Sequence, residues 1–186
     1  MNKERLISFE DAILAIIMTI LVLELKKPAE VSLQGLWALH TNFFAYALSF
    51  FWLGVMWVSH HNNWQNVKQI NMGTVMLTLV LLFFASLFPY TTSLVSDNFN
   101  NITAQTFYGA IIIVISLLNV ATSVNLGKLN PKAHFHLLYT TPNYIVYLDL
   151  GLKLVGLVLA ITVYPPAMMM TIFLASAMLM IGFTQV

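Results

Sequence analysis

Six long apolar stretches dominate the pattern of this chain, and short polar segments separate them. A helix that spans a bilayer needs about 20 consecutive, mostly apolar residues. Pro165 and Pro166 divide the last two stretches, because adjacent prolines stop a helix and favour a turn. The pattern predicts an all-α, polytopic membrane protein with six transmembrane helices, at about residues 6–25, 36–59, 72–95, 104–126, 143–163 and 167–183.

The apolar stretches are apolar on all sides, whereas the strands of a membrane β-barrel alternate apolar and polar residues. The polar separators are too short to form a separate soluble domain, so we expect one transmembrane domain over residues 1–186. Acidic residues interrupt the beginning of the first stretch, and no small-residue cleavage site follows it. We therefore expect residues 1–26 to be a retained first helix rather than a cleaved signal peptide.

Composition supports a lipid environment and excludes several functions. Hydrophobic residues make up 59% of the chain and charged residues 8%, whereas a soluble domain carries about 25% charged residues. A soluble protein with so few charges could not cover its surface with polar groups. The net charge of +1 leaves no electrostatic footprint for nucleic acid, and the absence of cysteine excludes disulfide and thiolate chemistry.

Basic residues in the polar segments predict the orientation, because cytoplasmic loops of membrane proteins are enriched in Lys and Arg. Lys26 and Lys27 lie in the segment after the first helix, and Glu24 beside them suggests an interfacial ion pair or a solvated cluster. The other basic residues of the loops and the N-terminus fall on the opposite side of the six predicted spans. We therefore expect both termini to be cytoplasmic, together with Lys3, Arg5, Lys68, Lys128 and Lys132.

Ionisable residues inside a span are energetically costly and are candidates for functional roles. The fifth predicted helix carries Asp149 and Lys153, whose i, i+4 spacing predicts an intrahelical ion pair that lowers the cost of both charges. The first helix holds most of the remaining ionisable residues, and the other spans have essentially none. These first-helix residues are Arg5, Glu10, Asp11 and Glu24.

One apolar stripe runs along the first helix at about 100° per residue. Asp11 lies about 140° from Ile16 around that helix, so the stripe and the carboxylate point in different directions. For Asp11, a buried structural hydrogen bond is a better explanation than a direct role in transport. By spacing alone, lipid contact or packing explains such a stripe more often than a pore does. The stripe consists of Ile13, Ile16, Ile20 and Leu23, with Phe9 close to it.

Three segments of the chain resemble one known family of membrane proteins. Residues 5–11, RLISFED, resemble the R-x-x-x-F-S-D signature of the transmembrane protein 175 potassium-channel family, and the helix that follows, through Glu24, is also similar. Residues 57–61, WVSHH, resemble W-V-N-H-H at the end of that family's second helix. Residues 82–91, LFFASLFPYT, resemble the end of its third helix. Two positions depart from the pattern: Glu10 replaces the serine of the signature, and Thr78 replaces an asparagine of the third helix.

The resemblance implies a potassium-permeable cation channel, not an enzyme, with no cofactor besides permeant K⁺. In the family, six-helix subunits form homotetramers in which the first helices surround a central pore, and rings of large apolar side chains form its constriction. By position these rings are Ile16, Ile20 and Leu23, with Thr19 as the nearest polar group. A packing network would fix the first helix, and its members by position are Arg5, Phe9, Asp11, Trp57 and His60. The implied setting is a lipid bilayer, most simply a bacterial plasma membrane.

Two other classes of function remain as alternatives. A proton- or ion-coupled secondary transporter could use Asp11 and Asp149 as protonatable groups. An intramembrane metalloenzyme would need ligands from the pair His60 and His61 or from the His134-x-His136 segment. Adjacent histidines point about 100° apart on a helix, and no H-E-x-x-H motif is present, so we expect no metal site.

Overall fold

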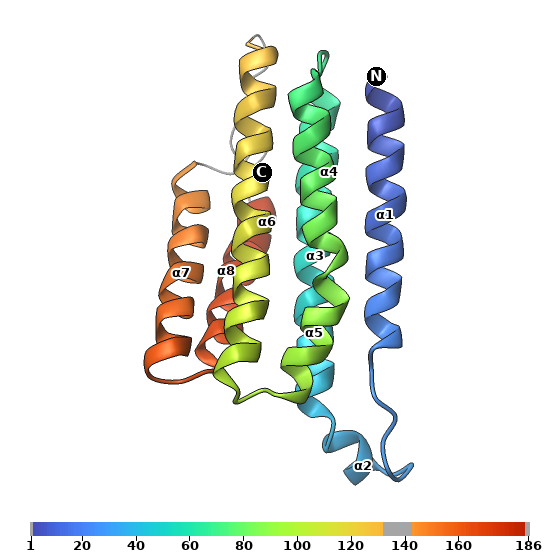
Figure 1. Ribbon diagram of the computed structural model, residues 1–186, viewed down its shortest axis with the longest axis vertical. Coiled ribbons are helices and arrows are strands. Elements are labelled where there is room, and N and C mark those ends of the chain that lie inside the picture. The colour runs from blue at the N-terminus through green and yellow to red at the C-terminus, as the bar shows by residue number, and fades with distance from the viewer. Residues whose placement is uncertain (1, 132–142, 185–186) are drawn as a thin grey trace.

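The computed structural model describes residues 2–131 and 143–184, and every regular element within these ranges is a helix (Figure 1). The all-α fold class predicted from the apolar pattern is therefore confirmed. Lys132, His134 and His136, which entered the predictions of orientation and metal binding, lie outside the described residues.

Eight helices make up the described part of the chain, and five helical stretches of it are long and apolar enough to cross a membrane. Those five are α1 (Lys3–Leu23), α3 (His40–Asn66), the consecutive pair α4 (Met72–Ser86) and α5 (Phe88–Asp97), α6 (Ile102–Leu129) and α7 (Asn143–Thr162). The sixth predicted span corresponds to α8 (Ala167–Thr184), whose clearly apolar part is the shorter stretch Ala167–Met180. The remaining helix, α2 (Leu33–Trp37), lies in the connection between α1 and α3.

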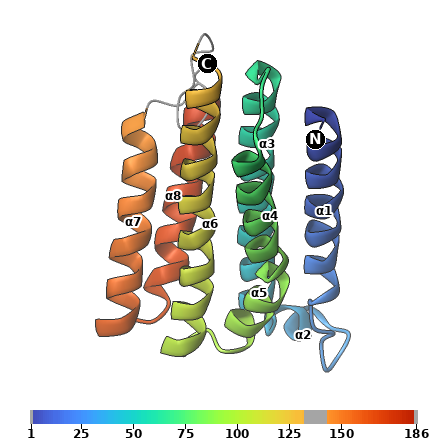
Figure 2. The same cartoon turned by 45° about the horizontal axis from the view of Figure 1, so that its top comes forward.

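The long helices run up and down beside one another, with α1 at one edge of the bundle and α7 at the opposite edge (Figures 1 and 2). Helix α1 packs against α3, α4 and α5, whereas α6 in the middle packs against α4, α5, α7 and α8. Because six crossings alternate in direction, the N-terminus and the end of α8 point toward the same side (Figure 1). An edge position leaves one face of α1 without a neighbour in its own subunit.

The third predicted span is a broken helix rather than a continuous one. Helix α4 ends at Ser86 and α5 begins at Phe88, with Leu87 between them. Pro89 has no backbone N–H and therefore cannot donate to the carbonyl of Ala85, which interrupts the helical hydrogen-bond pattern. The backbone resumes with a bond from the Thr91 N–H to the Leu87 carbonyl of 3.0 Å. The presence of Pro89 in the sequence already indicated a break at this point.

Helix α3 continues well past the predicted end of the second span at residue 59, and it stops only at Asn66. Residues from 60 onward suggested a loop, but they are helical, and His60 and Trp64 among them contact Glu10 inside the bundle. The buried side chains of Asn63 and Trp64 face inward in this last part of the helix. Helix α3 therefore carries polar groups into the interior near one end of the bundle.

Two groups of buried apolar side chains hold the bundle together. The larger one joins α1, α3, α4, α5, α6, α7 and α8, and includes Trp52, Phe88 and Ile112 at its centre. The smaller one lies at the end of the bundle that carries the N-terminus, and consists of Leu6, Trp64, Val67, Val75 and Leu126.

The basic residues after α1 include an ion pair, but its partner is not the predicted one. The Lys26 ammonium lies 2.8 Å from a carboxylate oxygen of Asp97 at the end of α5, instead of pairing with Glu24. Asn42 of α3 also donates to Asp97, at 3.1 Å. The contact ties the connection after α1 to α3 and α5, which is a tertiary arrangement that adjacency in sequence does not show.

The close packing of α7 on α8 depends on glycine at position 156. A Cβ atom placed there would lie 2.8 Å from Cβ and 3.1 Å from Cγ2 of Thr171, and closer still to its hydroxyl. We expect Gly156→Ala to lower the free energy of unfolding by about 1–3 kcal/mol, because overpacking forces the helices apart. Denaturant unfolding in detergent, followed by tryptophan fluorescence, measures the change.

Gly151 on the same helix provides the matched control, because a Cβ atom there would meet no atom within 4 Å. Gly151→Ala should leave stability unchanged or raise it by about 0.5–1 kcal/mol, since alanine is a better helix former than glycine. Equal effects at both positions would contradict the close approach of α7 and α8.

Candidate pore face and interior polar network

Helix α1 has two distinct faces. The inward face consists of the buried residues Leu6, Glu10, Leu14, Ile17 and Leu21. The outward face carries the predicted constriction residues, where Ile16 is 58% exposed, Ile20 37% and Leu23 78%, and Thr19 is exposed as well. Within one subunit these large apolar side chains therefore have little to pack against, and they lie on the edge of the bundle.

Thr19 adds a polar group to this outward face. Its hydroxyl donates a hydrogen bond of 2.7 Å to the Ile16 carbonyl, one turn earlier in the helix. A hydroxyl that donates its single hydrogen keeps its oxygen lone pairs available as acceptors. The outward face thus presents one acceptor oxygen among large aliphatic side chains.

Two members of the predicted packing network, Arg5 and Phe9, lie on the outward face instead of in the interior. Both are exposed, and Phe9 is 47% accessible. At 100° per residue, each falls within about 20° of Ile16 around the helix. Their side chains extend the outward face of α1 toward the N-terminus.

Asp11 contacts Trp57, as the predicted network requires, but it is not buried. The Trp57 Nε1–H donates to Asp11 Oδ1 at 2.8 Å, and both residues are exposed. The prediction that Asp11 accepts a structural hydrogen bond is confirmed, whereas the prediction that Asp11 is buried is wrong. This contact joins α1 to α3 at the surface of the bundle.

The buried carboxylate of α1 is that of Glu10, which the sequence did not single out as a site residue. Glu10 is 2% exposed, and its Oε2 accepts a hydrogen bond of 3.0 Å from Trp64 Nε1. Its Oε1 faces Nδ1 of His60, whose Nε2 lies 2.6 Å from the Asn119 Oδ1. His60 thus joins α1 to α6 through Glu10 and not through Asp11. Glu10 could have been identified from the sequence, because a carboxylate within a membrane span is energetically costly and therefore a candidate for a functional role.

The predicted ion pair in α7 is present in the structure. The Lys153 ammonium lies 2.6 Å from Asp149 Oδ2 and 2.9 Å from Ser116 Oγ of α6, and both ionised residues are buried. It also sits 5.5 Å from the centre of the Trp52 ring of α3, within the range of a cation–π contact. The charged side chain of Lys153 thus connects α7 to α6 and α3.

A polar stripe on α6 completes the interior network, and the sequence analysis missed it. At about 100° per residue, Ser116, Asn119 and Ser123 lie within about 60° of one another on one face of the helix, whereas Thr122 and Asn125 turn progressively away from that face. They are neutral, so a search for ionisable residues within the spans passed over them. The stripe consists of Ser116, Asn119, Thr122, Ser123 and Asn125. Asn125 at its end donates to Thr74 Oγ1 of α4 at 2.8 Å.

Among the described residues, no three histidine, aspartate or glutamate side chains are arranged so that they could hold a metal ion. His61 turns away from His60, stacking on Trp57 at 5.5 Å between ring centroids and lying 3.0 Å from Gln65 Nε2. The two histidines therefore belong to different surroundings, as their 100° separation on a helix implies.

Comparison with known proteins adds an independent line of evidence. A family model described as the endosomal/lysosomal potassium channel TMEM175 matches residues 5–89. A potassium channel of Chryseobacterium sp. (strain P1-3) is 45% identical over 92 residues, which is 50% of this chain and 48% of that protein. A potassium channel of Streptomyces collinus is 31% identical over 102 residues, 52% of this chain and 50% of that protein. The chain spans about half the length of the curated relatives it matches.

The overall fold also has a solved counterpart. The crystal structure of a lysosomal potassium-selective channel TMEM175 homolog from Chamaesiphon minutus superimposes with a TM-score of 0.68, covering 98% of this chain and 95% of that one at 21% identity. That likeness concerns the fold. The matched residues 5–89 contain the first two sequence segments that carry the resemblance, 5–11 and 57–61, and all but the last two residues of the third, 82–91. The model match to residues 5–89 and the sequence relatives agree in their likeness to TMEM175 potassium channels, and this part of the chain is similar to that family.

Proposed function

We propose that this protein is a potassium-permeable cation channel, formed by a homotetramer whose α1 helices surround a central pore. The family description and the names of both bacterial relatives are those of potassium channels. Neither catalytic chemistry nor a cofactor enters the proposal, and the transported species is K⁺ together with other monovalent cations.

One observation carries this proposal, namely the outward face of α1. Ile16, Ile20 and Leu23 are large, apolar and exposed at the edge of the subunit. A lipid-facing surface would accept these side chains too, but the family description is that of a potassium channel, and a channel needs a pore lining. Cavities within the bundle are small, and the larger hollows lie on its surface. Assembly of several α1 helices around an axis turns the outward face into a pore lining.

A ring of isoleucine side chains controls ions by excluding water. A hydrophobic constriction that is narrow enough loses its water, and an ion cannot enter without replacing its hydration shell. In the proposed pore Ile16 and Ile20 form the narrow rings, Thr19 supplies an oxygen beside them, and Leu23 widens or closes the mouth. Such a pore favours K⁺ over Na⁺ modestly, because the larger ion loses its water at lower cost while few ligands replace it.

The proposed setting is a bacterial plasma membrane with both termini in the cytoplasm. Helical stretches long and apolar enough to span a membrane make up most of the described chain, as an integral membrane protein requires. Lys3, Arg5, Lys68 and Lys128 lie at the end of the bundle that carries the N-terminus (Figure 1). At the opposite end Lys26 is neutralised by Asp97. Although Lys27 also lies at that opposite end, this distribution supports a cytoplasmic location for the first end, because positive charge is enriched there.

A secondary transporter using Asp11 and Asp149 is the alternative. Such a transporter would bring its protonatable groups to a common substrate site near the middle of the membrane. Asp11 lies at the surface with Trp57, whereas Asp149 lies in a cavity that Asp11 does not line. The separation of the two carboxylates favours the channel over the transporter.

Reconstitution in planar bilayers tests the proposed function. With K⁺ on one side and Na⁺ on the other, we expect discrete single-channel steps and a reversal potential displaced toward the K⁺ equilibrium potential. A passive pore needs no gradient of protons, so the steps should persist at equal pH on both sides. Flux that saturates far below channel rates, or that requires a proton gradient, would favour the transporter instead.

A further inference from the structure

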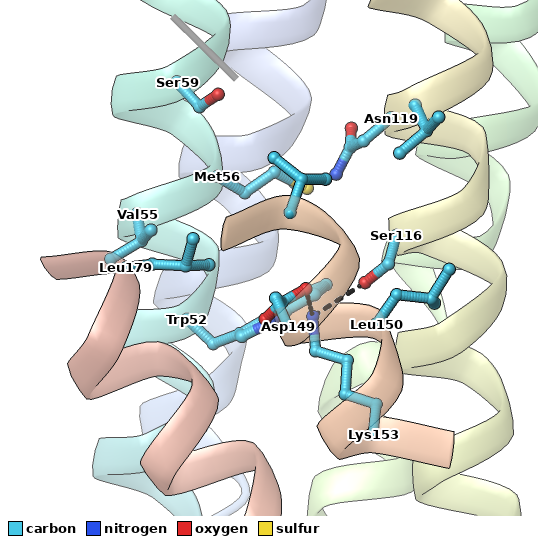
Figure 3. Close-up of a pocket in the computed structure, with 12 residues that line it drawn as sticks. Trp52, Val55, Met56, Ser59, Ser116, Asn119, Asp149, Leu150, Lys153 and Leu179 are labelled. Carbon is cyan, nitrogen blue, oxygen red and sulfur yellow. Dashed lines mark hydrogen bonds and ion pairs between the residues drawn. The ribbon is translucent and has the colours of Figure 1, made fainter. Parts of the chain in front are cut away.

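Two small cavities lie inside the subunit, and Asn119 lines both. The first, of about 50 Å³, lies between α3, α6, α7 and α8, and Figure 3 shows Asp149, Lys153, Ser116 and Ser59 around it. The second, of about 10 Å³, lies between α1, α3, α4 and α6 and is lined by Glu10. A cavity needs roughly 10–15 Å³ to hold one water molecule. Together the cavities have room for about four.

Buried polar atoms around these cavities lack protein partners. Asp149 Oδ1 and Ser59 Oγ at the first cavity have no hydrogen-bond partner among the described residues, nor does Asn63 Oδ1 at the second. All three residues are at least 95% buried. An unpaired polar atom in such surroundings costs about 1–3 kcal/mol, and buried water is the usual partner. The unpaired polar atoms and the available volume therefore both point to water as the ligand of these cavities.

The neighbours of His60 determine how many protons the Glu10–His60 pair holds. Its Nε2 faces the oxygen of Asn119, which only accepts, so Nε2 carries a hydrogen. Its Nδ1 faces a carboxylate oxygen of Glu10, and a hydrogen bond between them needs a second proton, either on the ring or on the carboxyl group. The pair therefore holds one proton more than a neutral imidazole beside a carboxylate. Without this extra proton, the ionised Glu10 carboxylate would be buried with the Trp64 Nε1–H as its one hydrogen-bond donor among the described residues.

We propose that the two cavities form one hydrated chamber in each subunit, which binds a proton at the Glu10–His60 pair and links it through water and Asn119 to Asp149. On release, the shared proton passes to a water molecule, and Glu10 keeps its negative charge while His60 keeps its Nε2–H. The chamber lies behind α1, away from the outward face, and does not rest on the proposed pore.

Other charged groups on the surrounding helices set the charge balance of the pair. Helix α1 contributes Lys3, Arg5 and Asp11, and α3 contributes His61. Helix α7 contributes Asp149 and Lys153, which neutralise each other. Helices α4 and α6 line the second cavity with neutral side chains such as Thr78 and Thr122. Glu10 is thus the one carboxylate lining the second cavity, and a single proton neutralises it.

Radiolytic labelling with ¹⁸O water tests for water in the chamber. Met56 lines the first cavity and is 5% exposed, whereas Met168 and Met169 are fully buried and line neither cavity. We expect Met56 to take up label several-fold faster than Met168 and Met169 in the reconstituted protein. In the double variant Asp149→Leu with Lys153→Met, which replaces the ion pair by apolar side chains, Met56 should fall to the rate of the controls. Equal labelling of all three methionines in the natural chain would overturn the proposal.

Nitrogen-15 and carbon-13 nuclear magnetic resonance of labelled protein in lipid tests for the proton. Near neutral pH, the pair should show either a doubly protonated His60 ring or a protonated Glu10 carboxyl group. In Glu10→Gln, His60 should become an ordinary neutral ring with one proton, and His61 should be unchanged because it lies outside the chamber. A neutral His60 ring opposite an ionised Glu10 in the natural chain would overturn proton binding, whatever the channel measurements show.

Discussion

Replacing Ile16 by asparagine is expected to raise the resting K⁺ current of the reconstituted protein about tenfold or more. In the proposed tetramer, four amide groups around the narrow section would hold water where four isoleucines would exclude it, so the energetic barrier to a hydrated ion would fall. A tenfold increase corresponds to a barrier lowered by about 1.4 kcal/mol. We also expect weaker discrimination between K⁺ and Na⁺, because a wetter and wider section strips less water from either ion. Single-channel recording and reversal potentials measure both effects.

Val158→Asn is the matched control for this experiment. Val158 and Ile16 are both 58% exposed and apolar, but Val158 lies on α7, at the edge of the bundle opposite α1. Insertion of asparagine costs a similar amount of desolvation at either site if both face lipid. If Val158→Asn raises the current as much as Ile16→Asn does, or if neither variant alters it, α1 does not line the pore.

The second large effect concerns the buried charge of α7. Lys153→Met is expected to lower the free energy of unfolding by about 3–5 kcal/mol, because it leaves Asp149 ionised and unpaired in the interior. The lysine also loses its contacts with Ser116 and the Trp52 ring. Denaturant unfolding in detergent micelles, followed by tryptophan fluorescence, measures the loss.

Two further variants separate the charge from the packing. The double variant Asp149→Leu with Lys153→Met should be no less stable than the natural chain, since apolar side chains of similar size replace a buried pair at little or no cost. Lys26→Met removes a partner from the surface pair with Asp97, where the Lys26 side chain is 55% exposed. That loss should stay below about 1 kcal/mol. If Lys153→Met costs no more than Lys26→Met, the pair in α7 is hydrated far more than its burial indicates.

The two faces of α1 are expected to govern different properties of the protein. The outward face, with Ile16, is proposed to meet other subunits around the pore. The inward face, with Glu10, connects through His60 and Asn119 to the interior of the same subunit. A change at Glu10 is therefore expected to alter proton binding and stability first. A change at Ile16 is expected to alter permeation without loosening the bundle.

Local features of the sequence were sufficient to predict the helices and one ion pair. Long apolar runs predict spanning helices, because a helix satisfies its own backbone hydrogen bonds in lipid. The spacing of Asp149 and Lys153 predicts their contact, because residues four apart lie on the same side of a helix whatever surrounds it. The segment from Arg5 to Asp11 indicates the family for the same reason: its information is contained in consecutive residues.

Which side of each helix faces the interior was decided only by tertiary packing. Glu10 and Asp11 are neighbours in the chain, yet one is buried against His60 and the other is exposed beside Trp57. A turn of about 100° per residue separates them, and only the positions of α3 and α6 determine which one is enclosed. The polar side chains of α6 line the interior cavities for the same reason, because the neighbouring helices enclose that side of α6. Sequence alone determined that these helices would form and span, whereas the neighbours that each helix meets determined which of its polar groups are enclosed.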